Sequence, residues 1–160
     1  MGTEESKFGT TIDGRRILVT GADGLVGSWL TARLVALGGE VTVLRRDRPR
    51  SSALDVELGD ARVETIVGDL SDTALLESAI SERGLDTVVH LAAQATVGPA
   101  NISPRPTFES NVLGTWNVLE AARLNKASRV VVASSDTAYG PSTELPYTEA
   151  MALEASHPYD

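Results

Sequence analysis

Hydrophobic residues along this chain gather in short runs that alternate with longer stretches of helical periodicity. The runs occupy residues 17–19, 41–44, 63–67, 87–91 and 130–133. They are largely apolar throughout rather than at every second position, which is typical of parallel strands covered on both faces. Right-handed crossovers between such strands leave few topologies. We therefore expect an α/β fold, a doubly wound parallel sheet of the Rossmann type with strand order 3-2-1-4-5.

The first helical stretch begins near Leu25. Its hydrophobic residues recur at helical spacing, which predicts a buried face made of Val26, Leu30, Leu34 and Leu37. The pair Gly38-Gly39 is expected to end this helix. A second helix is expected between Asp72, whose carboxylate can cap it, and Gly84, which can stop it.

The longest predicted helix begins near Pro104, since proline suits a first helical turn. Its apolar face is expected to consist of Phe108, Val112, Trp116 and Leu119. Trp29 and Trp116 are both interpreted as packing residues. Residues 1–14 are expected to form a flexible leader and residues 140–160 a loop, so that residues 15–160 make one domain.

A glycine-rich turn, Gly21-Ala22-Asp23-Gly24-Leu25-Val26-Gly27, joins the first strand to the first helix. Such a turn directs backbone N–H groups and the positive end of a helix at a phosphate. Gly21 permits the tight turn, Gly24 admits a pyrophosphate, and Gly27 lets the helix pack closely on the strand. The spacing is one residue longer than the usual fingerprint, so the flanking strand and helix carry the interpretation. We expect this loop to bind a dinucleotide.

The end of the second strand reads the adenosine ribose in such folds, and here it carries Arg45 and Arg46, followed by Asp47. Arginine forks onto a phosphate, which favours NADP over NAD. A solvated basic loop is the alternative, and Asp47 keeps NAD open. Asp69, at the end of the third strand, is expected either to accept a hydrogen bond from the adenine amino group or to serve as a turn residue.

The amino-acid composition argues against several classes of function and of binding site. A net charge of −8 argues against non-specific nucleic-acid binding. The absence of cysteine removes disulfides, thiolate zinc sites and cysteine nucleophiles. With two histidines far apart, no metal site is expected. No run is long enough to span a membrane, and the N-terminus is polar and acidic, so a cytoplasmic protein is expected.

Five motifs in order resemble the extended short-chain dehydrogenase/reductases. They are Thr20–Gly27, Gly68-Asp69-Leu70, His90-Leu91-Ala92-Ala93, Asn111–Thr115 and Ser134–Gly140. Within that family the chain is most similar to the NAD-dependent nucleotide-sugar epimerases and dehydratases. The CDP-glucose 4,6-dehydratase type is the nearest match, from Gly27-Ser28-Trp29-Leu30 and His157-Pro158-Tyr159. The resemblance covers about residues 16–160.

The resemblance implies a catalytic pair, Ser135 and Tyr159. Tyr159 would take a proton from a sugar hydroxyl while hydride leaves the same carbon for nicotinamide, and Ser135 would orient that hydroxyl. Asp136 fills the acid position of the dehydratases, but Thr137 stands where a second partner is usual, so epimerisation, dehydration and oxidoreduction stay open. The family's lysine falls three positions beyond Asp160. The chain is therefore expected to be an N-terminal fragment, without the last strands or the substrate domain, and inactive alone.

The resemblance also assigns cofactor contacts and partners. Besides the glycine loop, the cofactor is expected to contact Leu70, Leu91, Ala92, Ala93 and Asn111, with Asn111 bracing the backbone. The expected partners are a nucleotide sugar and a second copy of the chain, packed through the long helices. His90 is expected to be a satisfied strand-end residue. The alternative function is a non-catalytic dinucleotide-binding module that senses redox state or binds a partner.

Overall fold

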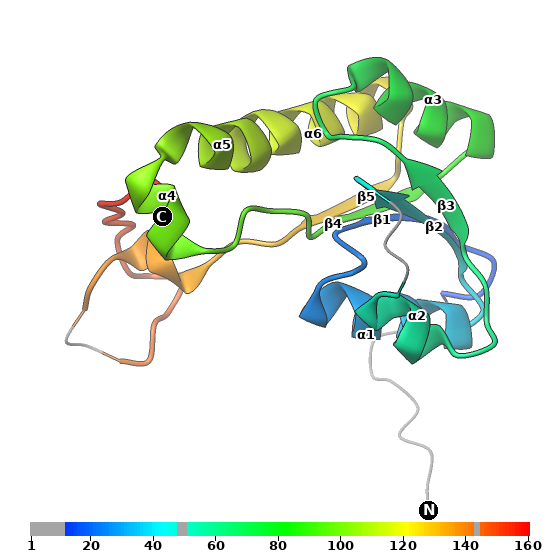
Figure 1. Cartoon of the computed structure of the whole chain (residues 1–160), viewed down its shortest axis with the longest axis horizontal. Coiled ribbons are helices and arrows are strands. Elements are labelled where there is room, and N and C mark those ends of the chain that lie inside the picture. Colours follow the sequence, from blue (N-terminus) through cyan, green and yellow to red (C-terminus); the bar gives the residue numbers. More distant parts are fainter. Residues whose placement is uncertain (1–11, 48–50, 143–144) are drawn as a thin grey trace, which may run out of the picture.

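A single parallel sheet organises the molecule. The computed structural model describes residues 12–47, 51–142 and 145–160. The strands are β1 (Arg16–Thr20), β2 (Glu40–Arg45), β3 (Glu64–Val67), β4 (Thr87–His90) and β5 (Arg129–Val132). Their order is β3-β2-β1-β4-β5 with all neighbours parallel, which confirms the predicted Rossmann-type fold (Figure 1).

Helices cover both faces of the sheet (Figure 1). One face carries α1 (Leu25–Ala36) and α2 (Ala53–Leu58), and the other carries α3 (Thr73–Arg83) and α6 (Gly114–Leu124). Between β4 and α6 the chain forms α4 (Val97–Ile102), α5 (Pro104–Phe108) and a π-helical turn at Glu109–Leu113. A 3₁₀ turn at Asp136–Tyr139 follows β5. The six-residue helices α2 and α4 were not anticipated, because they are too short to show a periodic pattern.

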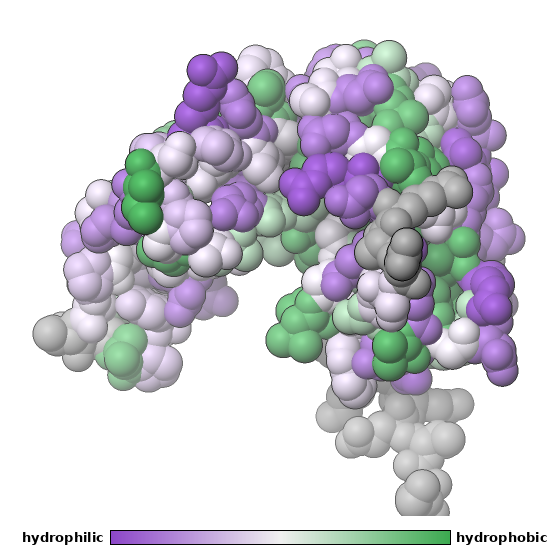
Figure 2. Space-filling view, in the orientation of Figure 1, coloured by the Kyte–Doolittle hydropathy of each residue, from purple (hydrophilic) through white to green (hydrophobic). Residues whose placement is uncertain are grey.

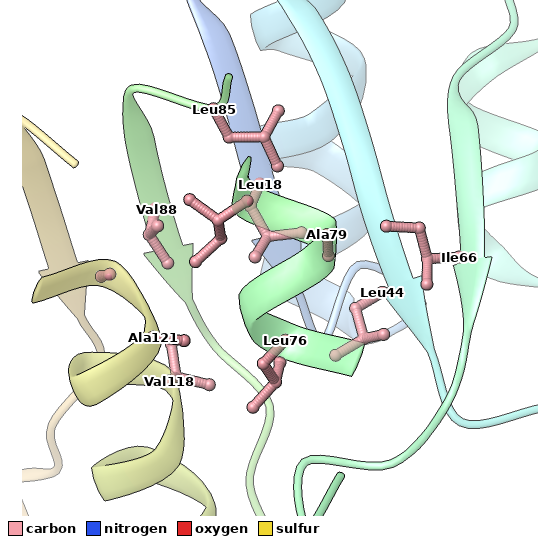
Figure 3. Close-up of a cluster of buried hydrophobic side chains, with 11 residues drawn as sticks. Leu18, Leu44, Ile66, Leu76, Ala79, Leu85, Val88, Val118 and Ala121 are labelled. Carbon is pink, nitrogen blue, oxygen red and sulfur yellow. The ribbon is translucent and has the colours of Figure 1, made fainter. Parts of the chain in front are cut away.

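Alternation along the strands divides the core into two layers. The layer beneath α3 and α6 contains Leu18, Leu44, Ile66, Leu76, Ala79, Leu85, Val88, Val118 and Ala121 (Figure 3). The layer against α1 and α2 contains Ile17, Val19, Val41, Val43, Leu54 and Val89. Consecutive residues of one strand thus enter opposite layers. Both layers are apolar, which is why the strands are hydrophobic at consecutive positions.

The predicted buried face of α1 is partly wrong. Val26 is 67% exposed and Leu37 is also exposed, whereas Leu34 is buried as predicted. The helix instead buries small residues, Gly27, Ser28 and Thr31, together with Leu34. The reason is the close approach of the start of the helix to the glycine turn at Gly27, which leaves room only for small side chains near that end, whereas Leu34 packs further along.

The predicted apolar face of the long helix is wrong as well. Phe108, Val112, Trp116 and Leu119 all lie exposed, and Trp29 on α1 is exposed too. The buried face of α6 consists of Gly114, Val118, Ala121 and Ala122. Small residues and a valine allow the helix to lie close to the sheet, so the larger apolar side chains point outward. Trp116 and Leu119 lie in α6, while Phe108 ends α5 and Val112 lies in the π-helical turn before α6. We refer to these four outward residues together as the α6 stripe.

The ends of the elements follow their local signals. Asp72 caps α3 by accepting a hydrogen bond from Leu75 N at 3.0 Å, and Gly84 ends α3 in the left-handed region, as predicted. Ile12 and Gly14, from the expected leader, hydrogen-bond to Arg15 and Gly38, while residues 1–11 lie outside the described part. All residues of β5 are exposed, which leaves one edge of the sheet open.

Candidate dinucleotide-binding site

The glycine loop links β1 to α1, and two of its glycines are required by the protein itself. Gly21 has φ +74°, and a Cβ there would lie 2.6 Å from Ala92 N. A Cβ on Gly27 would overlap the carbonyl oxygen of Gly21. Gly24 differs, because its Cβ would meet only the Gly21 oxygen at 3.4 Å, an ordinary contact. The backbone at Gly24 is therefore open to a ligand.

The first turn of α1 has no side-chain cap. Gly24 is its N-cap residue, and no acidic residue lies in the first turn. By contrast, Ser52 caps α2 and Asp72 caps α3. Backbone N–H groups at an uncapped helix start carry a partial positive charge and favour an anion. These features fit the diphosphate of a dinucleotide, which the loop and the first turn of α1 would hold.

A buried chain of hydrogen bonds fixes the neighbouring strand end. Thr20 Oγ1 lies 2.7 Å from His90 Nδ1, and His90 Nε2 lies 2.9 Å from Thr115 Oγ1. Thr20 Oγ1 also accepts from Ala92 N at 3.2 Å. Burial lowers the pKa of His90, so its ring is held neutral between two hydroxyl groups. His90 is thus the satisfied strand-end residue that was expected.

Asn111 braces the segment that follows β4. Its Oδ1 accepts from Gln94 N at 2.7 Å, and its Nδ2 donates to Gln94 O at 3.2 Å. The side chain lies within the π-helical turn. Asn111 therefore holds the backbone beside Leu91, Ala92 and Ala93, as expected, and its amide is occupied by protein partners.

A cleft of about 290 Å³ opens beside this segment. Its walls come from the end of β4, the π-helical turn, α6, the end of β5 and the last residues of the chain: His90, Leu91, Ala92, Ala93, Ala95, Asn111, Thr115, Ala133, Ser134, Ser135, Tyr159 and Asp160. The space-filling view shows the molecule hollowed between the part with α4 and the part with α1 and α2 (Figure 2). Ser135 and Tyr159, 24 residues apart in sequence, thus line one cleft.

Ser135 is tied into the 3₁₀ turn that follows it. Its hydroxyl oxygen accepts from Thr137 N at 3.3 Å and from Thr137 Oγ1 at 3.0 Å. The Ser135 hydroxyl donates to Asp136 Oδ1 at 3.5 Å. These bonds fix the position of the hydroxyl at the carboxyl end of β5, where doubly wound sheets place their ligands.

Arg45 is engaged by the protein rather than open to a phosphate. Its Nη2 donates to Asp23 Oδ1 at 2.9 Å, to Asp55 Oδ1 at 3.1 Å and to Ser52 Oγ at 3.0 Å. The Arg45 hydrogen bond, with those of Ser52, lowers the pKa of Asp55. The sequence interpretation missed Ser52 and Asp55, although the spacing Ser-x-x-Asp before a helix is a capping-box signal.

The other polar residues at this edge divide between local roles and exposure. Asp69 Oδ1 accepts from Ser71 N at 2.9 Å and from Ser71 Oγ at 2.8 Å, and these bonds lower the pKa of Asp69. Asp69 therefore has the turn role, one of the two expected, and Leu70 O accepts from Asn117 Nδ2. Arg46 is exposed at the end of β2.

In the described part of the chain, no cluster of acidic, histidine or cysteine side chains could hold a metal ion. No described helix is long and apolar enough to cross a membrane.

A parallel sheet in this order, with an uncapped helix after a glycine turn, defines a dinucleotide-binding protein of the Rossmann class. Residues 17–160 match the sequence model of the NAD dependent epimerase/dehydratase family, and the chain belongs to that family.

Several proteins of similar sequence or structure are UDP-glucose 4-epimerases. A "UDP-glucose 4-epimerase 3" of Oryza sativa subsp. japonica is 32% identical over 99% of this chain, and a "UDP-glucose 4-epimerase" of Corynebacterium glutamicum is 33% identical over 90%. The chain spans 44% and 42% of the lengths of these relatives. A UDP-glucose 4-epimerase from Brucella ovis, solved with NAD, superposes with a TM-score of 0.81 at 29% identity, over 91% of this chain and 43% of that one.

Proposed function

We propose that this chain is the NAD-binding part of a nucleotide-sugar epimerase that acts on a UDP-sugar. The observation that carries the proposal is the cleft that Ser135 and Tyr159 share beside the Leu91–Ala93 backbone and Asn111. The named relatives are UDP-glucose 4-epimerases, and one similar structure, from Stenotrophomonas maltophila, was solved with NAD and a UDP-arabinopyranose derivative (TM-score 0.83, 26% identity). A CDP-glucose 4,6-dehydratase activity has less support.

The side chains of the cleft fit proton transfer at a sugar hydroxyl. Bound nicotinamide would supply hydride acceptance and return. Tyr159 would remove the hydroxyl proton, and Ser135 would hold the hydroxyl by a hydrogen bond. Asp136 is already bonded to Ser135, and Thr137 offers no second acid or base, so the residues favour epimerisation over elimination of water.

Tyrosine needs activation for this role. With a pKa near 10, only about 0.1% of it is phenolate at pH 7, and a nearby ammonium is the usual remedy. None of the residues that line the cleft is a lysine. We therefore propose that the 160-residue chain binds its cofactor and sugar nucleotide but turns over extremely slowly.

The test combines binding and turnover. Calorimetry with NAD is expected to show binding, and saturation-transfer NMR of the NAD-loaded chain is expected to detect UDP-glucose. The UDP-glucose signal should fall severalfold in Ser135→Ala/Tyr159→Phe, and UDP-galactose formation should stay below detection. Binding of NAD with no response to any UDP-sugar would contradict the proposed sugar-nucleotide site in this cleft. Rapid hydride transfer by the purified chain would refute the proposed need for an added ammonium.

We also propose that the chain associates with a second copy through the α6 stripe, the homodimer that the family resemblance implies. Contiguous exposed apolar side chains of this kind commonly mark interaction sites. Trp116, which is 66% exposed, is the largest residue of the stripe. Trp116→Glu is expected to weaken the dimer about tenfold or more in sedimentation velocity, because buried tryptophans dominate interfaces. Trp29→Glu, at an equally exposed tryptophan on the other helical layer, is the matched control. A monomeric parent chain would contradict this proposal.

The cofactor of the proposed enzyme is NAD rather than NADP. The preference for NADP depended on Arg45 being available to a phosphate, and in the structure Arg45 is bonded to Asp23 and Asp55.

A further inference from the structure

Three residues from separate elements meet at the end of β2. Asp23 belongs to the glycine loop, Arg45 ends β2, and Asp55 lies in the first turn of α2. Arg45 is only 10% exposed, and its Nη2 serves both carboxylates and Ser52 Oγ. We propose that Asp23 and Asp55 latch Arg45 away from the cofactor and thereby set the preference for NAD over NADP. The proposal rests on the dinucleotide site proposed above, and we call these three residues the Arg45 latch.

The hydrogen bonds of the latch close one edge of the guanidinium. A phosphate is bound most strongly when two N–H groups of one edge fork onto its oxygens. On the Nε–Nη2 edge, Nη2 already has three oxygen partners. Nε is buried, without a hydrogen-bond partner among the described residues. Nη2 also belongs to the Nη1–Nη2 edge, so neither edge of the guanidinium can present two free N–H groups to a 2′-phosphate while the latch is formed.

The charges at the latch also disfavour a 2′-phosphate. Two carboxylates accompany a single guanidinium, so the three side chains together carry one negative charge. Asp69 lies close enough to Arg46 that the Arg46 charge contributes to lowering its pKa, so the neighbouring exposed arginine is also partly balanced. A ribose 2′-hydroxyl can donate to a carboxylate, whereas a phosphate offers mainly acceptors and negative charge. Carboxylates so placed favour the hydroxyl and repel the phosphate.

Releasing Arg45 should therefore reverse the preference. In Asp23→Asn/Asp55→Asn both side chains keep their size but lose their charge, and the amide oxygen introduced by Asp55→Asn retains an acceptor for the cap of α2. We expect the parent chain to bind NAD at least about tenfold more tightly than NADP in calorimetry. In the double variant, affinity for NADP should rise about tenfold or more, the effect of one charge-assisted hydrogen bond. Adding Arg45→Gln to the double variant should remove that gain.

A matched control separates the latch from general charge. Asp60→Asn/Glu77→Gln makes the same change in net charge at exposed residues, and it should leave the NAD to NADP ratio unchanged. Thermal melting shows whether the double variant folds, and Asp23→Asn alone, at a loop residue outside the α2 cap, should give a partial gain in any case.

Three results would contradict the latch, and a fourth would contradict the proposed function instead. The latch is overturned by a parent chain that prefers NADP, by no gain in NADP affinity in the double variant and Asp23→Asn, or by a gain that survives Arg45→Gln. The last result would assign phosphate recognition to Arg46. If the parent chain binds neither dinucleotide, the proposed function fails rather than the latch.

Discussion

Replacing Gly27 by alanine is expected to abolish dinucleotide binding and to lower the free energy of unfolding by about 3 kcal/mol. The added methyl group would overlap the carbonyl oxygen of Gly21, which is backbone and cannot swing aside. The helix must then move away from the glycine turn. That movement also removes the first-turn N–H groups of α1 from the phosphate position.

Gly24→Ala separates binding from folding. Its backbone, with φ −74° and ψ 168°, suits any residue, and the new methyl group meets only an ordinary contact. Stability should fall by about 1 kcal/mol, much less than in Gly27→Ala, because alanine is a poorer N-cap residue than glycine. Binding of NAD should still weaken by at least about tenfold, because the methyl group would stand where the diphosphate approaches the backbone.

The measurements are urea unfolding and calorimetry with NAD on each variant. Gly98→Ala in α4 is the control for NAD affinity, because its added Cβ meets nothing within 4 Å beyond its chain neighbours and lies outside the glycine loop. Some loss of stability is expected there, because Pro99 follows and disfavours a Cβ on a helical neighbour. Unaltered NAD affinity in Gly24→Ala would show that the diphosphate does not approach the glycine turn, and the proposed site would be wrong.

Lowering the pH from 7.5 to 5 is expected to destabilise the chain through His90. Burial depresses the pKa of His90 in the native state, while the unfolded chain titrates near 6.5. Below about pH 6.5 His90 binds a proton in the unfolded state but not in the native state. The contribution of His90 to the free energy of unfolding is therefore fully present above about pH 6.5. Below that pH it decreases by up to about 1.4 kcal/mol per pH unit, until the native pKa is reached.

Urea unfolding at pH 7.5, 6 and 5 measures this loss. His90→Gln lacks the titrating ring and should have a lower stability at pH 7.5 but a flatter dependence across the window. His157→Gln, at the other histidine, is the matched control variant. The carboxylates of Asp55, Asp69 and Asp86 have lowered pKa values, so their contributions are lost only at more acidic pH, below about 4. Equal slopes for His90→Gln and the parent would contradict the neutral, buried assignment of His90.

Local sequence patterns were sufficient to predict the strands, the caps of α3 and the glycine loop. The five runs are apolar at consecutive positions, which indicates cover on both faces, and right-handed crossovers then leave few topologies, the observed order among them. Asp72 and Gly84 delimit α3 because capping depends on residues within one turn. Gly21, Gly24 and Gly27 were interpretable because their spacing, between a strand and a helix, is typical of a dinucleotide-binding turn.

Helix faces and side-chain partners were decided by the tertiary structure. Helical spacing shows that hydrophobic residues share a face, but it does not say which of two apolar faces meets the sheet. In α1 and α6 the close approach of the backbones selected small residues for the core, so Val26 and Trp116 turned outward. Arg45 likewise could not be interpreted alone, because Asp23 and Asp55, 22 residues before it and 10 after it, meet its guanidinium only once the sheet and helices are packed.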